Sequence, residues 1–397
     1  MAKLITKWWW VIAGLLLGAM YVYGYQRMYF HQDDLDWFIL ANRPLIDVLR
    51  APIGDHVNYV WRLLLKVEWD LFGMTFPWYL AVSLTIHASV VWLLYYLARA
   101  TSGRADLSAM AALLFSVNTN WTETILWISG QTITITALFV LLSMIAIWQK
   151  KSEGIALLLA SWTSALAIGV LGASALVYKK MRWQTLGVLV LLGIIYKQWA
   201  TDGTSIAFSL EWLGQVGVVW GLMPVNSVIG RLLIPFDRLE TVRIILVCLA
   251  LFYGAWKWRD KLLGIWRDEW SRFLLLHLGI YNLIVAVGRA QYGVGIMRAE
   301  RYTYLGLLLV LLLAVRVMRN VKIGRWAWIV PMIVVSQCIG FYHRAEGYIE
   351  RPQQLKKLVQ EIKQTDPTAI NQGAYLPHFV LNDERLKYRD LLPLLKD

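Results

Sequence analysis

Long apolar runs alternate with short polar segments along most of this chain. A helix that crosses a bilayer needs about 20 largely apolar residues, with a range of about 17–25. Two of the runs, 154–168 and 170–178, are close enough to be read as one long span. Counted separately, they complete a set of eleven predicted spans at residues 8–25, 77–98, 106–118, 130–148, 154–168, 170–178, 184–199, 241–256, 272–288, 303–316 and 325–342.

Basic residues in the predicted loops orient these spans. Cytoplasmic loops of membrane proteins carry an excess of Lys and Arg. With the N-terminus placed in the cytoplasm, the inside segments hold 18 of the 39 basic residues. Merging 154–178 into one span would move every later basic loop outside, so the bias favours two spans there. The inside set is Lys3, Lys7, Arg99, Arg104, Lys150, Lys151, Lys179, Lys180, Arg182, Lys257, Arg259, Lys261, Arg267, Arg272, Arg316, Arg319, Lys322 and Arg325.

Three predicted outer segments are long. The loop 26–76 holds polar turns and interfacial helices, and the loop 199–240 is apolar but interrupted by Gly and Pro, which is typical of interfacial or re-entrant helices. Apolar positions at helical spacing predict an amphipathic helix over 352–364. We therefore predict an all-α polytopic membrane protein with a transmembrane unit at 1–342 and a small extracytoplasmic C-terminal region at 343–397. The apolar face of the tail helix comprises Leu355, Leu358, Val359 and Ile362.

The composition supports membrane insertion and argues against nucleic-acid binding, a disulfide framework and a cysteine metal site. Hydrophobic residues make up 58% of the chain and charged residues 16%, whereas soluble proteins average about 45–50% and about 25%. The 22 Trp and 19 Tyr suit aromatic belts at the interface. The net charge of +13 is explained by topology, and no basic aromatic patch indicates nucleic-acid binding. Cys248 and Cys338 lie in apolar runs, so neither predicts a disulfide framework or a metal site.

Polar side chains gather in the first outer loop. The stretch "HQDDLDWF" follows the first span and places Asp33 and Asp34 beside a histidine. The stretch "GDHVNYVWRLL" adds His56 and Arg62, which can donate hydrogen bonds near the paired acids. The alternatives are a hydrated acid-rich loop in the first case and a polar turn before an interfacial helix in the second.

A single glutamate lies in another outer segment. The stretch "SVNTNWTETILWISGQ" joins two predicted spans and contains Glu123 with almost no other charge. A carboxylate close to bilayer depth is costly unless it is hydrated or paired, so a functional role is one explanation. The other is that Glu123 occupies the N-terminus of the next helix, where a negative charge is favoured.

Arginines occur on the outer side against the inside bias. The stretch "VGRAQYGVGIMRAERYTYLG" contains Arg289, Arg298 and Arg301. Arginine pairs with phosphate through two parallel hydrogen bonds, so this cluster suits a phosphorylated lipid. The alternative is that these side chains reach ordinary headgroups. Carboxylates for proton transfer and arginines for a phosphate leaving group together suit sugar transfer from a polyprenyl-phosphate carrier to a hydroxyl.

Four of these segments, in order, resemble the GT-C glycosyltransferases. The likeness is to the protein O-mannosyltransferase and tetratricopeptide-bearing mannosyltransferase branch and its bacterial relatives. It covers roughly 26–150 and 285–310. The segments are "HQDDLDWF"; "GDHVNYVWRLLLKVEWDLFGMTFPWYLAVSLTIHASVVWLLYYLAR", which contains His87; "NTNWTETILWISGQTITITALFVLL"; and "ERYTYLG". This sequence departs from the family in having "NYVWRLL" for a frequent "RPL", "YLG" for "YLP", and no tetratricopeptide repeats.

The resemblance implies a GT-C-like bundle of about eleven transmembrane helices and a role for each matching residue. Asp33 would deprotonate the acceptor, with Asp34 as neighbour or alternate, and Glu123 would orient the acceptor or support the acids. The reaction would invert the anomeric carbon. A metal is not required, although paired acids leave room for a divalent one. The donor phosphate and substrate would be held by a set consisting of His56, Arg62, Arg289, Arg298, Arg301 and Tyr302.

Other functions remain open at this point. The rivals are a transporter or flippase of a lipid-linked saccharide, a polysaccharide polymerase or ligase that uses a diphosphate carrier, and a non-catalytic scaffold of the cell envelope. The expected partners are a polyprenyl-phosphate-sugar donor, a glycan, lipid or protein acceptor, and the bilayer. We expect a multi-pass plasma-membrane protein with a cytoplasmic N-terminus and with its active site and C-terminus extracytoplasmic.

Overall fold

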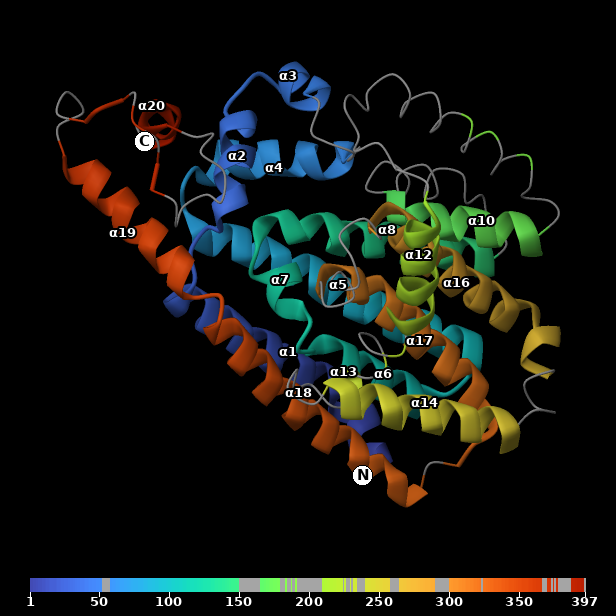
Figure 1. Ribbon diagram of the computed structural model, residues 1–397. Helices are drawn as coiled ribbons and strands as arrows, with labels where there is room; N and C mark the ends of the chain where they lie inside the picture. The colour runs from blue at the N-terminus through green and yellow to red at the C-terminus, as the bar shows by residue number, and fades with distance from the viewer. Residues whose placement is uncertain are drawn as a thin grey trace.

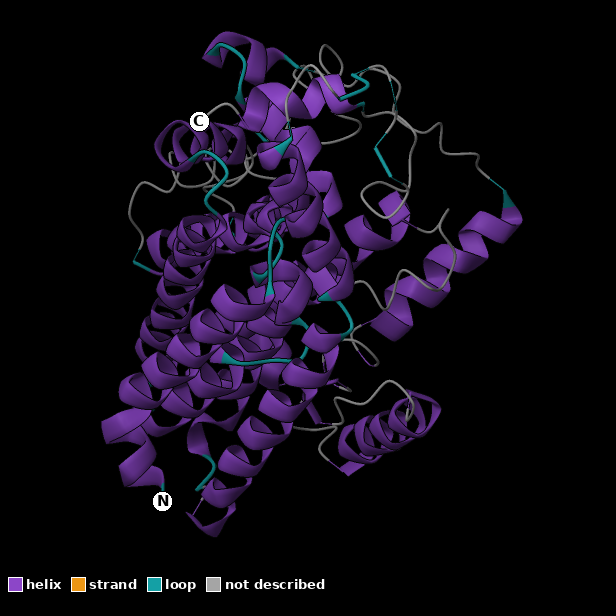
Figure 2. Cartoon of the chain, turned by 90° about the vertical axis from the view of Figure 1, so that its left-hand side faces the viewer, coloured by secondary structure: helices purple, strands orange, loops and turns teal. Residues whose placement is uncertain are grey.

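A computed structural model describes most of the chain, and its described residues are helical, with no β-sheet among them (Figures 1 and 2). Some helix positions, Asp33 among them, are described without their side chains. The described residues are 1–51, 58–149, 165–178, 209–223, 231–233, 240–257, 264–289, 300–322, 324–365, 370–372, 374, 376–377 and 387–395, with single positions at 183, 187, 190, 225 and 229.

Five of the described helical segments are long and apolar enough to cross a membrane, which indicates a membrane protein. Each is at least 18 residues long, and at about 1.5 Å per residue that length approaches the thickness of the hydrocarbon core. They pack into one bundle (Figure 1). The segments are α1 (Ala2–Arg27), α5 (Phe76–Ser102), α8 (Gln131–Trp148) with the preceding turn from Ile128, α16 (Glu269–Arg289), and α17 (Thr303–Val317) with its extension to Asn320.

The prediction of eleven spans is therefore wrong, and two short helices show why. Helices α6 (Ala105–Ser116) and α10 (Ile168–Val177) are apolar, but they have 12 and 10 residues. Nine of the 12 residues of α6 are buried, and the helix packs against α1, α5 and α17. Hydropathy along a chain does not distinguish a helix that faces lipid from one that is apolar because protein surrounds it.

Two further predicted spans are helices that carry charges. Helix α14 (Glu240–Lys257) contains Glu240, Arg243 and Lys257, and α18 (Ile329–Glu346) ends in a polar turn that includes His343 and Arg344. Neither is among the five apolar segments. The predicted spans at 154–168 and 184–199 fall largely outside the described residues.

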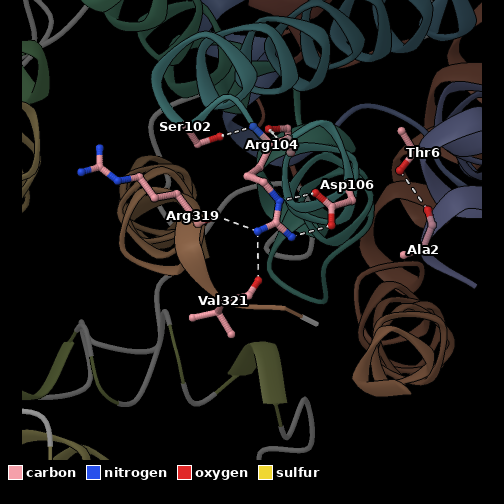
Figure 3. Close-up of polar contacts among 8 residues, drawn as sticks. Ala2, Thr6, Ser102, Arg104, Asp106, Arg319 and Val321 are labelled. Atoms are coloured by element: carbon pink, nitrogen blue, oxygen red, sulfur yellow. Dashed lines mark hydrogen bonds and ion pairs between the residues drawn. The ribbon is translucent and has the colours of Figure 1, made fainter. Parts of the chain in front are cut away.

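Arg104 and Arg319, two of the basic residues assigned to the cytoplasm, meet at one end of the bundle (Figure 3). Arg104 pairs with Asp106 and donates from Nη1 to the carbonyl oxygens of Arg319 and Val321, at 2.7 and 2.9 Å (Figure 3). The first turn of α1 lies in the same view (Figure 3). Segments far apart in the chain therefore meet at this end of the bundle.

The other end of the bundle carries a layer of shorter helices (Figure 1). They are α2 (Gln32–Ala41), α3 (Leu45–Arg50) and α4 (Tyr59–Phe72), in the loop where interfacial helices were predicted. Helix α4 is amphipathic: it buries Trp61 and Leu65 and exposes Leu71. A helix with one apolar face exposed at the end of a membrane bundle suits the interface.

The C-terminal tail packs back onto this layer. Helix α19 (Glu350–Gln364) follows α18 closely and buries the four apolar residues predicted for its face. Helices α19 and α20 (Tyr388–Leu391) both contact α2. The predicted boundary between 342 and 343 falls inside α18, so the start of the tail reaches the bundle as part of a continuous helix.

Candidate functional site

Segments that are distant in sequence converge at the end of the bundle that carries α2, α3 and α4 (Figure 1). Helix α7 (Trp121–Ile125) packs against the 3₁₀ helix Glu300–Tyr302, and α18 contacts both α7 and α13 (Arg231–Leu233). The first residues of α2 approach the same place through the 3₁₀ helix Ile128–Gly130. The site is therefore built from five separate stretches of chain.

The predicted glutamate and one predicted arginine are in contact. Glu123 Oε2 accepts a hydrogen bond from the Arg301 backbone N–H at 3.3 Å, and Glu123 Oε1 lies 4.0 Å from Arg301 Nη1. The ion pair is long, so the backbone bond is the firmer link. Glu123 also stands in the first turn of α7, where a carboxylate is favoured by the helix dipole. The position of Glu123 thus fits both a functional role and a role at the N-terminus of a helix.

Two aromatic rings flank the Arg301 guanidinium. Its Cζ atom lies 5.4 Å from the ring centroid of Trp127 and 5.4 Å from that of Tyr302. The Arg289 Cζ lies 5.7 Å from the Tyr302 ring. Cation–π contacts of this kind contribute about 0.5–1 kcal/mol at exposed sites and more when dry. The rings restrict the guanidinium and keep two cationic groups close together, as an anion site requires.

The acidic segment joins the same cluster through Trp127. The His31 and Trp127 rings are 4.7 Å apart between centroids. Asp34 is fully buried, and its Oδ2 accepts the His31 backbone N–H at 2.7 Å, a reciprocal cap at the start of α2. The cap fixes the helix turn that carries Asp33, although the Asp33 side chain lies outside what is described.

The structure adds two arginines and a tyrosine that the sequence did not single out. Tyr348 lies just after the end of α18. Burial raises the pKa of Tyr348, as does the charge of Glu123, while Arg344 and Arg231 lower it. The Tyr348 ring centroid is 6.4 Å from that of His31. These residues therefore extend the cluster from the acidic segment toward the tail.

Arg231 is a fully buried arginine within a predicted apolar loop. Its Nη1 donates to Asn120 Oδ1 at 2.8 Å. The available signal was the single Arg in the apolar stretch "NSVIGRLLIPF". Burying a charge at membrane depth costs free energy, so a charged residue in such a stretch indicates a functional site. What the sequence could not show is that this residue meets the segment before Glu123.

A buried amide holds the Arg231 backbone. Gln337 Nε2 donates to the carbonyl oxygens of Arg231 and Leu232, at 2.7 and 2.9 Å. Gln337 Oε1 accepts from the backbone N–H and the hydroxyl of Thr119, at 2.9 and 3.0 Å. The amide has two donors and two acceptor positions, and all are used. Helix α18 thereby fixes both the arginine and the α6–α7 connection.

Arg62 has a structural task in this fold. Its Nη1 donates to the carbonyl oxygens of Val48, Leu49 and Ala51, at 3.5, 3.3 and 2.8 Å. The side chain is buried and satisfies the C-terminal end of α3, where carbonyls lack helical partners. Its predicted role with the donor phosphate stays a prediction. His56 and Arg298, assigned to the same phosphate, lie outside the described residues.

A second buried carboxyl lies behind α2. Glu68 Oε1 accepts from Gln131 Nε2 at 3.0 Å, and Gln131 Oε1 accepts from Trp61 Nε1 at 3.3 Å. Trp61 packs edge-on against Trp37 of α2, with centroids 4.5 Å apart. Burial raises the pKa of Glu68 to about 8, although the Gln131 bond lowers it. This carboxyl is therefore largely protonated at neutral pH and adds no charge to the site.

No group of three or more His, Cys, Asp or Glu side chains that could hold a metal ion occurs among the described residues. No family model matches the chain, and comparisons with curated proteins and with solved structures gave no match either. The site's own geometry is therefore the basis for a functional proposal.

Proposed function

We propose that this protein is a membrane glycosyltransferase that moves a sugar from a polyprenyl-phosphate donor to an acceptor hydroxyl on the extracytoplasmic side. One observation carries the proposal: the acidic segment, Glu123 and Arg301 meet around Trp127. The three come from parts of the chain that the sequence resemblance had placed in one active site. A carboxylate pair beside an arginine cluster is the set of groups that this reaction needs.

The chemistry divides between the two halves of the cluster. Asp33 takes the proton of the acceptor hydroxyl, and the acceptor oxygen bonds to the anomeric carbon. The bond from that carbon to the phosphate oxygen breaks, and the phosphate leaves with the electron pair. Arg289 and Arg301 stabilise the charge that builds on the phosphate. Attack from the side opposite the leaving group inverts the anomeric carbon.

The packing supports preorganised groups on both sides of the reaction. The backbone cap between Asp34 and His31 holds the turn that carries Asp33. The contact with Glu123 and the two flanking rings hold Arg301. Groups held in place before substrate binds cost no reorganisation during the reaction, which is where such sites gain most of their rate.

Transport of a lipid-linked saccharide is the main rival. Transporters place functional charges near the bilayer midplane, on interrupted spans. Here the charged cluster lies at the end of the bundle that carries the interfacial helices. That position favours the enzyme. A polymerase or ligase would share the arginines but would not need the acidic pair after the first span.

The test compares lipid-linked sugars and envelope glycans by mass spectrometry in cells that lack the gene. The cells receive wild type, Asp33→Asn, Glu123→Gln or Arg301→Gln at equal membrane abundance. The matched control is Asp36→Asn, which removes an exposed carboxylate from the same helix. We expect wild type and the control to consume the polyprenyl-phosphate sugar and restore one glycan decoration, whereas Asp33→Asn does neither.

Two outcomes would contradict the proposal. If Asp33→Asn restores the decoration as well as wild type does, the acidic pair is not catalytic. That result would favour a transporter or a non-catalytic scaffold. If no lipid-linked sugar accumulates in the cells without the gene, the donor class is wrong.

A further inference from the structure

Two tryptophans six positions apart in one segment differ in how their indole N–H groups are bonded. Trp121 begins α7, and its Nε1 donates to the carbonyl oxygen of Phe115 at 2.6 Å. The Nε1 atom of Trp127 is also buried, but it has no acceptor among the described residues. A buried donor without a partner costs free energy, so its presence in a folded protein needs an explanation.

The surroundings of Trp127 distinguish it from Trp270, whose buried Nε1 also lacks an acceptor among the described residues. Trp270 packs against two other aromatic rings. The Trp127 ring instead lies 4.7 Å from the His31 ring, between centroids, and its centroid is 5.4 Å from the Cζ atom of Arg301. The unpaired N–H of Trp127 therefore belongs to the candidate site, next to the acidic segment and to a guanidinium.

We infer that Trp127 is a substrate-binding residue, whose Nε1–H donates a hydrogen bond to the donor phosphate that Arg301 stabilises. The inference rests on the proposed function, because it adds a ligand-binding group to the same site. The guanidinium lies 5.4 Å from the centroid of the Trp127 ring, which is close enough for one phosphate to contact both groups. The phosphate is then held by one charged and one neutral donor.

The charges near Arg301 favour a neutral second donor. Glu123 Oε1 lies 4.0 Å from Arg301 Nη1, so this carboxylate offsets part of the guanidinium charge. A phosphate has several acceptor oxygens, and hydrogen bonds to a charged acceptor are stronger than those to a neutral one. The indole N–H only donates and carries no charge, so it adds such a bond without changing the charge balance of the site.

The chain around Trp127 is held in a compact loop by Gly130. A Cβ atom at Gly130 would lie 2.6 Å from the carbonyl oxygens of Glu123 and Thr124, so no other residue fits there without moving the backbone. The Gly130 backbone N–H also donates to the carbonyl oxygen of Trp127 at 3.0 Å. The loop thereby fixes the backbone of Trp127 relative to that of Glu123. A group placed in this way binds its ligand without first being ordered.

The experiment measures binding of farnesyl phosphate to the full-length protein in phosphatidylcholine nanodiscs by titration calorimetry. Farnesol, which has the same chain without the phosphate, is the second probe. Trp127→Phe removes the N–H and part of the ring. A second form carries β-(3-benzothienyl)alanine at position 127, so that sulfur replaces the N–H and the bicyclic shape is kept. Trp92→Phe, at an exposed position of α5, is the control.

We expect both forms altered at position 127 to bind farnesyl phosphate about tenfold more weakly or less, and farnesol within about twofold of wild type. Trp92→Phe should match wild type with both probes. Thermal unfolding without ligand adds a comparison with Trp121→Phe. The two Trp→Phe substitutions remove the same volume, but Trp121→Phe also breaks a hydrogen bond. Trp121→Phe should therefore lower the unfolding temperature further than Trp127→Phe does.

Three results would overturn the inference. The first is a benzothienyl form that binds farnesyl phosphate as tightly as wild type, which would mean that the N–H makes no bond to the phosphate. The second is an equal loss of farnesyl phosphate and farnesol binding, which would assign Trp127 to the lipid chain. The third is an unfolding temperature lowered as far by Trp127→Phe as by Trp121→Phe, which would give this N–H a partner within the protein. Failure of the proposed function looks different, because farnesyl phosphate then binds neither wild type nor the Trp92→Phe control.

Discussion

The Nδ1 atom of His87 lies 2.5 Å from the hydroxyl oxygen of Tyr304, inside the bundle. On the other side of the ring, Nε2 is 3.1 Å from the carbonyl oxygen of Ser116. A carbonyl can only accept, so Nε2 carries the proton and Nδ1 accepts from Tyr304. The neutral imidazole joins α5, α6 and α17. Because Tyr304 stands three residues after Arg301, this bond also fixes the start of the helix that follows the site.

Replacing Tyr304 with Phe tests this link. The substitution keeps the ring but leaves His87 Nδ1 buried without its donor. We expect a loss of about 1–3 kcal/mol in stability, the cost of an unsatisfied buried acceptor. The measurement is thermal unfolding in detergent. Tyr95→Phe is the control, since its hydroxyl is an exposed acceptor for Arg99, and it should change little. Equal effects from the two variants would show that the buried bond has no special weight.

Replacing Gln337 with Leu should be more damaging. The variant keeps the volume but removes all four hydrogen bonds of the amide, so buried groups of Thr119, Arg231 and Leu232 lose partners. We expect a loss of about 3 kcal/mol or more, since each unsatisfied group costs about 1–3 kcal/mol. Gln360→Leu, at an exposed position of α19, is the control. A Gln337 variant as stable as wild type would mean that α13 is held by other contacts.

The raised pKa of Glu68 predicts a free energy of unfolding that falls as the pH rises. Its pKa is about 8 in the folded protein, above the ordinary value of 4.5. Between these values the unfolded chain has lost the proton while the folded protein keeps it, so stability falls with rising pH, by at most about 1.4 kcal/mol per unit. Glu68→Gln should remove this contribution. Unfolding measured from pH 5 to 8 checks it, with Asp70→Asn as an exposed control on α4. An unchanged slope in Glu68→Gln would contradict the assignment.

The ion pair between Asp268 and Arg316, at the basic end of the bundle, predicts the opposite pH dependence. Burial raises the pKa of Asp268, but hydrogen bonds from Arg316, at 2.6 and 3.1 Å, and from Ser271 lower it by a larger amount. The pKa therefore lies below its usual range. Such a group stabilises the fold above its ordinary pKa of 3.8 and loses this effect as the pH falls. Asp268→Asn should cost about 1–2 kcal/mol at pH 7. Its deficit against wild type should shrink below about pH 4, as acid unfolding would reveal.

Cysteine labelling tests which end of the bundle faces outward. In a background with Cys248→Ala and Cys338→Ala, a cysteine replaces either Lys322, at the basic end, or Lys357, on α19. We expect a membrane-impermeant maleimide to label the Lys357 position in intact cells and the Lys322 position only after permeabilisation. The reverse pattern would place the candidate site in the cytoplasm and exclude an extracytoplasmic transferase.

Much of the secondary structure followed from local pattern. The amphipathic face of α19 was correct residue by residue, because helical spacing of apolar positions is a property of neighbouring residues. The number of spans was wrong for the same reason, since α6 is as apolar as a span but is surrounded by protein. Glu123 and Arg301 were chosen separately from the sequence, and their contact is a result of packing.

Local composition determined that this is a helical membrane protein with acidic and basic groups in the segments between its apolar helices, because hydropathy and charge are properties of neighbouring residues. Tertiary structure alone decided how those groups are used. It assigned Arg62 to the end of α3, brought buried Arg231 next to Asn120, and carried Tyr348 from the tail to His31. These contacts join residues from about 10 to more than 300 positions apart, and only side-chain packing can select such pairs.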